Sequence, residues 1–530
     1  MKSKLMSKDK AVKLIKDGDT VAVGGFVGCA HPEDITSEIE ENYIENRTPK
    51  NLTLIYAAGQ GDSADRGLNH FGHEGLVSKV IGGHWALSPK LQKLALDNKI
   101  EAYNLPQGII SQLYRDIAAK RPGTITHVGL KTFIDPRLEG GKLNTITKEN
   151  IVELINIGGK EYLFYKTIPL DVVILRATYA DEFGNATMEK EAAILDATAM
   201  AQAAKNSGGI VIVQVEQVVS KGSLDPKKVK IPGIYVDAIV VSQPKNHMQT
   251  FSENYNPSYS GEARFLVNSI VPMQLNERKV IARRAAMELV PNSVTNLGIG
   301  IPEGIATVAN EEGIADEMTL TIESGGIGGV PSGGLSFGAS TNPQSILDQA
   351  SQFDYYDGGG LDVAFLGLAQ CDRDGNINVS KFGPKIAGCG GFINISQNSK
   401  KVVYCGTFTA GGLKVKVENG KLNIEKDGKF NKFIDTVEQI SFSGQYAQSI
   451  GQTVLYITER AVFRLTKEGL FLEEIAPGID MKKDILDHMD FRPKISENLK
   501  IMDERIFKEE PIGINIGQSS KEFPGELSNV

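Results

Sequence analysis

TLTIESGGIGGVPSGGLSFGAS, residues 319–340, combines a short apolar run, one carboxylate and a glycine-rich loop. Thr319–Ile322 is rich in β-branched residues and predicts a buried strand. Glu323 follows directly, and the glycines between Gly325 and Gly334 allow close approach of the backbone to a ligand. The stretch therefore predicts either a carboxylate held for chemistry at a strand end, or a surface loop with a solvated glutamate.

The same alternation of strand, glycine loop and helix occurs twice in the chain. Thr20–Val23 precedes GGFVGCAHPE (24–33), and a second apolar run precedes NLGIGIPEG (296–304), each with a proline where a helix would start. Asp181-Glu-Phe-Gly-Asn185 likewise resembles Asp372-Arg-Asp-Gly-Asn376. We therefore expect two copies of one α/β unit, with the catalytic carboxylate in the second copy only.

Apolar runs elsewhere fit the same fold class. Strands covered on both faces, as in parallel sheets, are expected at Val172–Leu175, Ile210–Val215 and Ile234–Val241. Further expected elements are helices at 192–204, 279–289 and 482–489, a strand in INIS (393–396), and a meander at 454–473. The pattern dissolves between residues 244 and 276, where we place the boundary between domains 1–275 and 276–530. The prediction is two similar open α/β domains with mostly parallel sheets, fused in one chain.

Composition excludes several classes of partner. The 530 residues carry a net charge of −8, which argues against nucleic acid. No apolar run is long enough to span a membrane, and the N-terminal residues have no signal-peptide pattern. The four cysteines are far apart and form no C-x-x-C pair, as expected of reduced thiols in the cytoplasm. No metal site is expected, although His70, His73 and His84 leave that alternative open.

Established catalytic motifs are mostly missing. The chain has no G-x-S-x-G elbow, and Gly298-x-Gly300-x-x-x-Gly304 lacks the dinucleotide spacing. That loop is better interpreted as a tight turn, or as backbone N–H groups offered to an anion. A lone carboxylate suits covalent attack on an activated acyl group, and glycine-loop amides suit the resulting oxyanion.

Five motifs in the same order then resemble a known family. They are GGFVGCAHPE (24–33), NLPQG (104–108), NLGIGIPEG (296–304), ESGGIGGVP (323–331) and AGCGGFINIS (387–396). Together they resemble the class I coenzyme A transferases, in particular the single-chain propionate CoA-transferase type that acts on short acyl groups. The similarity runs nearly end to end, and the order of five motifs makes it specific.

The resemblance implies a ping-pong transfer of CoA between short-chain acyl-CoAs and free acids such as acetate, propionate, lactate or butyrate. Glu323 would form a glutamyl anhydride and then a glutamyl-CoA thioester. CoA would be a substrate, with no permanently bound cofactor, and a homo-oligomer is expected. Other site residues carried over from the motifs are Val27 and Gly28 for the acyl carboxylate, Gln107 for the reacting carbonyl, Gly298, Gly300 and Gly388 for CoA, and Gly390 and Gly391 for the oxyanion or thioester.

Two alternatives use the same fold. A short-chain acyl-CoA hydrolase would use Glu323 with water as the acceptor. A non-catalytic protein that binds CoA or a nucleotide would not need Glu323 for its activity. The requirement for an acceptor acid and the effect of Glu323→Gln distinguish the three.

Overall fold

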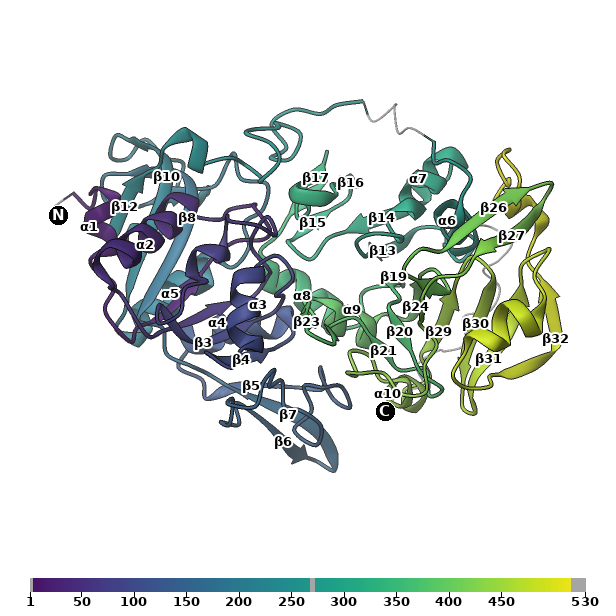
Figure 1. The fold of residues 1–530 in the computed structure, drawn as a ribbon. Helices are drawn as coiled ribbons and strands as arrows, with labels where there is room; N and C mark the ends of the chain where they lie inside the picture. Colours follow the sequence, from purple (N-terminus) through teal and green to yellow (C-terminus); the bar gives the residue numbers. More distant parts are fainter. Residues whose placement is uncertain (1–2, 267–271, 516–530) are drawn as a thin grey trace. The chain divides into compact units, whose positions relative to one another are not determined.

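The computed structural model describes residues 3–266 and 272–515, which form two compact units. The first unit contains the chain up to Phe265 together with Ile322–Gly358 and Ser380–Asn394, and the second contains the remainder (Figure 1). The Glu323 loop therefore packs with the N-terminal unit, although it lies in the C-terminal half of the sequence. The division into family domains 1–275 and 276–530 stays a prediction.

The first unit is built on a parallel sheet in the order β12-β10-β8-β1-β2-β3-β4. Short antiparallel strands β9 (Ala186–Thr187) and β11 (Val229–Ile231) extend β8. The parallel strands are β1 (Thr20–Val23), β2 (Leu52–Tyr56), β3 (Val77–Gly82), β4 (Glu101–Asn104), β8 (Val172–Asp181), β10 (Ile210–Val219) and β12 (Ala238–Val241). Both faces of the sheet are covered, as the continuous apolar runs predict.

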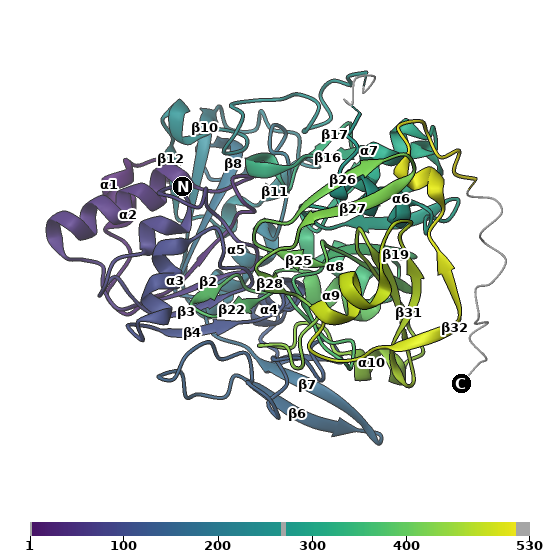
Figure 2. The same cartoon turned by 45° about the vertical axis from the view of Figure 1, so that its right-hand side comes forward.

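Helices cover the two faces of this sheet. Apolar residues of α1 (Lys8–Val12), α2 (Glu33–Asn46) and α3 (Pro89–Leu96) share one core with the sheet, and α1 lies between α2 and β12, in contact with both (Figure 1). Residues of α5 (Ala197–Ser207) contact β8, β10 and α4 (Gln107–Ala118). A separate antiparallel sheet contains β5 (Gly123–Thr126), β6 (Val152–Ile157) and β7 (Lys160–Lys166). In Figure 2, the hairpin of β6 and β7 extends below the parallel sheet.

The order of strands places a switch point at β1. From β1 the chain continues through β2, β3 and β4 on one side, whereas β8, β10 and β12 are added on the other. Ligands of open α/β sheets bind outside the carboxyl ends of strands at such a point. The loop that leaves β1 there is Gly24–Pro32, which leads into α2.

The second unit repeats this arrangement. Its sheet runs β14-β13-β19-β24-β29-β30-β31-β32, parallel as far as β29 and then antiparallel through β31. Here β13 is the switch strand, and its exit loop contains Gly298 and Gly300. The strands are β13 (Ser293–Leu297), β14 (Met318–Thr321), β19 (Val363–Gly367), β24 (Lys401–Cys405), β29 (Thr453–Ile457), β30 (Ala461–Thr466), β31 (Gly469–Ile475) and β32 (Lys494–Ile501).

Further elements of the second unit include three helices and a hairpin, and residues 279–286 of the first of these helices are all buried. They are α6 (Glu277–Ala286), α7 (Gly304–Glu311), α10 (Gly444–Ser449) and the hairpin β26 (Lys414–Glu418) with β27 (Lys421–Lys426). The predicted meander is confirmed as β29, β30 and β31. In the described residues, no helix is both long and apolar enough to cross a membrane.

The paired acidic turns are the same structure in both units. Asp181 accepts the backbone N–H groups of the residues two and four positions later, each at 3.0 Å, and the Asn185 side chain at 2.8 Å. Asp372 accepts the equivalent N–H groups at 3.0 Å and the Asn376 side chain at 3.0 Å. The prediction of two similar α/β folds is therefore confirmed at the level of individual hydrogen bonds.

Four expected elements differ. The strand expected at Ile234–Val241 forms only from Ala238 onward, because Gly233–Tyr235 is a 3₁₀ turn. INIS belongs to helix α9 (Phe392–Asn398), and its residues 393–396 are all buried, so no strand-like alternation exists to oppose a helix. α5 starts at Ala197 instead of Ala192, because Leu195 adopts a left-handed backbone with φ 54°. The predicted helix 482–489 is a π-turn (Met481–Ile485) followed by a 3₁₀ turn (Leu486–His488).

Candidate active site

Glu323 lies at the start of a turn that only glycine can complete. The N–H of Gly325 donates to Ile322 O at 3.0 Å, and Ile322 N–H donates to Gly326 O at 3.0 Å. Gly325 has φ +111°, and a Cβ there would lie 2.1 Å from Leu347 O. Any other residue would therefore push the backbone away and move Glu323 with it.

The carboxyl group of Glu323 is held in a desolvated position. The residue is partly exposed, but its Oε2 atom is inaccessible and has no hydrogen-bond partner among the described residues. Burial raises its pKa to about 7, and the opposing effect of its own backbone N–H is smaller. A carboxylate in such a place is poorly stabilised by water and is a better nucleophile for that reason.

Gly391 provides bare backbone beside this carboxyl group. A Cβ on Gly391 would lie 3.1 Å from Glu323 Cγ and 3.1 Å from Phe353 Cζ. Around it, Gly390 N–H donates to Gly83 O at 2.7 Å and Cys389 N–H donates to Asn104 Oδ1 at 2.9 Å. The N–H of Gly391 has no acceptor among the described residues, so it is the donor that remains for a reacting oxygen. Gly390 has a structural bond instead.

Gln107 completes this group from the first half of the sequence. It begins α4, and its backbone N–H donates to Gly390 O at 2.9 Å. Its side chain donates from Nε2 to Gln349 Oε1 at 3.0 Å, while its Oε1 lies 3.7 Å from the position of a Cβ on Gly390. Three of the residues selected from the sequence, Glu323, Gly391 and Gln107, are thus brought together in one unit.

Comparison with known proteins supports the same family. The coenzyme A transferase family profile matches residues 5–242. A caffeate CoA-transferase of Acetobacterium woodii is 50% identical over 519 residues, which cover 97% of this chain and 99% of that protein. Acetate CoA-transferase YdiF of Escherichia coli (strain K12) is 47% identical over 517 residues, 97% of each chain.

A solved structure agrees over nearly the whole length. Acyl-CoA transferase YdiF from E. coli O157:H7, in a thioester complex with CoA, matches with a TM-score of 0.92 at 46% identity, and the match covers 97% of this chain and 98% of that one. This chain belongs to the class I coenzyme A transferase family. It is accordingly a CoA-transferase enzyme.

The loop that leaves β1 in this transferase contains Val27 and Gly28. The N–H of Val27 donates to Gly59 O at 2.8 Å, whereas Gly28 N–H has no acceptor among the described residues. A Cβ on Gly28 would lie 2.3 Å from Phe251 N, so the position excludes any side chain. Of the two residues, Gly28 is the one whose amide remains available.

A second set of contacts links this loop to the nucleophile segment. Ser324, next to Glu323, donates from Oγ to Gly338 O at 2.6 Å. The ring of Phe26 lies 5.4 Å from that of Phe337, and a Cβ on Gly338 would lie 2.5 Å from Phe26. The residue before Val27 therefore packs on the segment that Ser324 anchors.

His84 is a site neighbour that the sequence assigned only to a possible metal site. It lies 3.7 Å from the position of a Cβ on Gly390, and its Cα lies 3.0 Å from that of a Cβ on Gly388. Burial, together with the charge of Lys385, lowers its pKa to about 4, so the imidazole is neutral near pH 7. The sequence signal that could have found it is its place after β3 and two glycines.

Gly298 and Gly300 lie in the second unit, in the exit loop of β13. Gly298 N–H donates to Phe365 O at 2.8 Å. Gly300 has φ +91° with open space around it, and its carbonyl accepts from Arg278 Nη2 at 3.0 Å. Their assignment to CoA stays a prediction.

The histidines considered for a metal have other partners. His70 hydrogen-bonds Glu33 at 2.9 Å and Glu40 at 2.5 Å, and His73 bonds Glu40 at 2.5 Å. These carboxylates raise the pKa of His70 to about 9 against the opposing effect of burial. Within residues 3–266 and 272–515, no group of three or more His, Cys, Asp and Glu residues could hold a metal ion.

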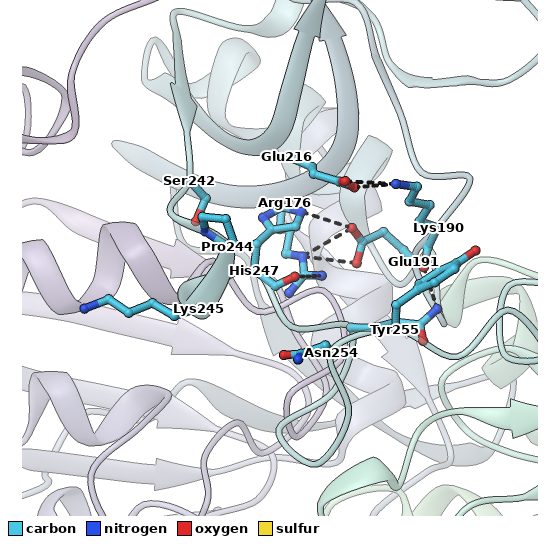
Figure 3. Close-up of a pocket in the computed structure, with 11 residues that line it drawn as sticks. Arg176, Lys190, Glu191, Glu216, Ser242, Pro244, Lys245, His247, Asn254 and Tyr255 are labelled. Carbon is cyan, nitrogen blue, oxygen red and sulfur yellow. Dashed lines mark hydrogen bonds and ion pairs between the residues drawn. The ribbon is translucent and has the colours of Figure 1, made fainter.

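A polar cavity of about 530 Å³ lies elsewhere in the first unit, near the ends of β10 and β12 (Figure 3). Its charges are largely compensated from within: Arg176 pairs with Glu191 at 3.2 Å, and Lys190 pairs with Glu216 at 2.8 Å. Arg176 also donates to Met248 O at 2.5 Å. These bonds attach the loop after β12 to β8 and pair the buried Arg176 with Glu191.

Proposed function

We propose that this enzyme is an acyl-CoA:carboxylate CoA-transferase that works through covalent intermediates on Glu323. The observation that carries the proposal is the partly desolvated carboxyl group of Glu323 against the side-chain-free backbone of Gly391. The pairing supplies a nucleophile and a hydrogen-bond donor at one place.

The reaction can be written in balanced steps. A Glu323 carboxylate oxygen attacks the thioester carbon, the C–S bond breaks, and CoA leaves as the thiolate, which leaves a mixed anhydride between Glu323 and the acyl group. The thiolate then attacks the Glu323 carbonyl carbon, the bond between that carbon and the bridging oxygen breaks, and the first acid leaves as a carboxylate that keeps the bridging oxygen. An acceptor carboxylate reverses both steps on the resulting glutamyl-CoA thioester, and Glu323 is regenerated.

The chain supports these steps in two ways. Each tetrahedral intermediate carries an oxyanion, for which the N–H of Gly391 is the proposed donor, with Gly28 facing the acyl carboxylate. Water would destroy both intermediates by hydrolysis, so the inaccessible Oε2 of Glu323 favours transfer over loss to solvent. We further propose that Gly298, Gly300 and Gly388 contact CoA.

The acid substrates are proposed by class. Relatives named for acetate and for caffeate are 47% and 50% identical to this chain, so one similar scaffold serves a small and a large acid. We propose short-chain acids, on the sequence resemblance. A homo-oligomer is proposed on the same ground, and light scattering tests it. The cytoplasm is proposed because all four cysteines are buried free thiols.

Acyl exchange tests the proposal directly. Wild-type enzyme should move CoA from propionyl-CoA to labelled acetate, and borohydride after incubation with acyl-CoA should mark Glu323 in a peptide map. Glu323→Gln should lose at least about 10³-fold in rate, because it removes the covalent route. The control is Glu317→Gln, an exposed glutamate six residues earlier.

The outcomes separate the alternatives. CoA release that is independent of added acetate identifies a hydrolase and contradicts transfer. Exchange that persists in Glu323→Gln contradicts the assignment of the nucleophile. A panel of acceptor acids of increasing length, with one donor, then decides the substrate class.

A further inference from the structure

A buried hydrogen-bond chain connects Gln107 with Asp196. Gln107 donates from Nε2 to Gln349 Oε1 at 3.0 Å, and Gln349 donates from Nε2 to Asp196 Oδ2 at 2.7 Å. Ser111 donates to the same Asp196 oxygen at 3.1 Å and lies 2.6 Å from Gln349 Nε2. None of the four residues is more than 6% exposed.

Burial raises the pKa of Asp196 to about 7, so near pH 8 its carboxyl group is ionised, and its charge then fixes the direction of this chain. An ionised carboxylate can only accept hydrogen bonds, so Gln349 must turn its NH₂ group toward Asp196 and its carbonyl toward Gln107. Gln107 must then turn its own NH₂ group toward Gln349. Its Oε1 is left on the side of Gly390, the residue next to Gly391.

The main chain of Gln349 is also fixed by a hydrogen bond. Its N–H donates to Leu195 O at 3.2 Å, and Leu195 has φ 54°, a left-handed conformation that a leucine rarely adopts. On α4, Arg115 follows Ser111 by four residues and pairs with Asp348 at 2.7 Å. Strained residues persist where the surroundings over-determine them, as at functional sites.

Burial of the Asp196 carboxyl group at this position costs free energy of folding. Its Oδ1 is buried and has no hydrogen-bond partner among the described residues. It borders a cavity of only about 10 Å³, shared with Gly24 and Gly25, which has room for one water molecule at most. A neutral asparagine would fill the same space without a buried charge, so packing alone does not explain the carboxylate.

We propose that Asp196 is a positioning residue for CoA transfer: through Gln349, it keeps the amide oxygen of Gln107 turned toward Gly390 as a hydrogen-bond acceptor. The inference rests on the proposed function of the Glu323 site. It changes the expected role of Gln107, because a carbonyl oxygen cannot donate to an oxyanion. The group that Gln107 Oε1 contacts in the substrate complex must be an N–H or O–H donor, and only the second N–H of Nε2 remains to donate to a substrate oxygen.

The test uses Asp196→Asn, which keeps the shape but can donate as well as accept, so the direction of the chain is no longer enforced. At pH 8, where Asp196 is ionised, we expect kcat for propionyl-CoA:acetate exchange to fall about tenfold, with KM for propionyl-CoA within about twofold of wild type. Thermal stability should be equal or higher. The matched control is Asp116→Asn, a buried aspartate of α4 that bonds Thr124 and Arg121, for which kcat should not change.

A double-mutant cycle excludes a merely structural role. If Asp196 acts through Gln107, then Asp196→Asn should cost little more in a Gln107→Ala enzyme that has already lost the contact. An equal loss in both backgrounds, or full kcat in Asp196→Asn, would overturn the inference. Should Asp196→Asn fail to fold, Gln349→Met interrupts the same chain and enters the same cycle.

The two proposals fail differently. If wild-type enzyme shows no acyl exchange, or exchange that does not need Glu323, the proposed function is wrong. If exchange needs Glu323 but is insensitive to Asp196→Asn and Gln349→Met, only the positioning role is wrong.

Discussion

The single oxygen atom Oε2 of Glu323 links stability to reactivity in this enzyme. It is inaccessible and unpartnered in the described chain, and this burial raises the pKa of the carboxyl group to about 7. The ionised form is therefore less favourable in the folded protein than in the unfolded chain. The same lack of solvation that costs stability makes the carboxylate reactive toward a thioester.

The first prediction concerns stability against pH. Since the folded pKa of Glu323 lies above the ordinary value of 4.5, the folded protein retains the proton longer. The contribution of Glu323 should therefore lower the free energy of unfolding as pH rises from about 4.5 to about 7. Glu323→Gln removes the effect and should be more stable than wild type by up to about 3 kcal/mol near pH 8.

Urea denaturation near pH 5 and near pH 8 measures this difference. The gain should be small at the lower pH, where Glu323 is largely protonated in the folded protein. Glu317→Gln, at an exposed position, should show no gain at either pH. A gain that is independent of pH would mean that burial of the charge is not its cause.

The second prediction concerns activity against pH. Only the ionised carboxylate attacks, so kcat/KM for acyl-CoA should rise about tenfold per pH unit and level off near pH 7. His84 cannot cause this rise of kcat/KM with pH, because its pKa is lowered to about 4. Burial also raises the pKa of Asp196 to about 7, so the pH dependence of kcat/KM should be measured again in Asp196→Asn. The same rise toward pH 7 should remain in this variant if Glu323 is responsible for it.

The third prediction concerns Gly391. A Cβ would lie 3.1 Å from both Glu323 Cγ and Phe353 Cζ, so Gly391→Ala must displace the nucleophile by a few tenths of an ångström. We expect a folded protein with about 10- to 100-fold lower acyl exchange. Gly367→Ala is the control, because nothing lies within 4 Å of its Cβ position and its φ is not positive. Equal activities of the two variants would contradict the placement of Gly391.

At the scale of elements, the enzyme reuses one strand-and-turn design. The switch strands β1 and β13 are each followed by a glycine loop, and β8 and β19 each precede an acidic turn. The likeness extends further: Asn185 Oδ1 accepts from Gly233 N–H at 2.8 Å, and Asn376 Oδ1 accepts from Gly444 N–H at 2.9 Å. Each turn thus connects its strand to the first residue of a later helix of its own unit, the 3₁₀ helix Gly233–Tyr235 in the first and α10 in the second.

The fourth prediction follows from these turns. Asp181→Ala removes three hydrogen bonds at a buried carboxylate and Asp372→Ala removes four, one of them long at 3.5 Å, and each change should cost about 2–4 kcal/mol of unfolding free energy. Asp225→Ala removes one bond at an exposed turn and should cost less than about 1 kcal/mol. Urea denaturation measures all three. A large difference between the two turn variants would argue against equivalent roles.

At the scale of the whole molecule, sequence order and compact units do not coincide. Residues 322–358 and 380–394 pack with the chain up to Phe265, and they supply Glu323, Gln349 and Gly391 to a group that includes Gln107. The active-site segments of the second half of the sequence therefore depend on the first half for their environment.

The fifth prediction tests this dependence by cutting the chain. Fragments 1–265 and 266–530, expressed separately, should each lack acyl exchange, because Gln107 and Glu323 are then on different molecules. Co-expression should restore exchange if the fragments associate, since the cut removes no contact of the α4 face with residues 348–354. Exchange by fragment 266–530 alone would contradict a role for the first fragment.

Much of the fold was predictable because its determinants are local. Apolar runs, glycine loops and repeated acidic turns indicated two parallel α/β units, and the structure confirms them. The exceptions were segments where neighbours outweigh local preference. INIS lies in helix α9, where all four of its residues are buried, and a short run buried throughout does not by its pattern distinguish a helix from a strand; α5 starts late because Leu195 is left-handed.

The sequence alone determined the family, the repeated design and the selection of Glu323, because strand ends and glycine turns are encoded by adjacent residues. Only the tertiary structure decided which amides are free, since the N–H of Gly390 is taken by Gly83 and that of Gly391 is not. It also decided the direction of the Gln107 amide, which depends on Asp196, 89 residues further along the chain. Hydrogen-bond partners distant in sequence fix such properties, and no local pattern encodes them.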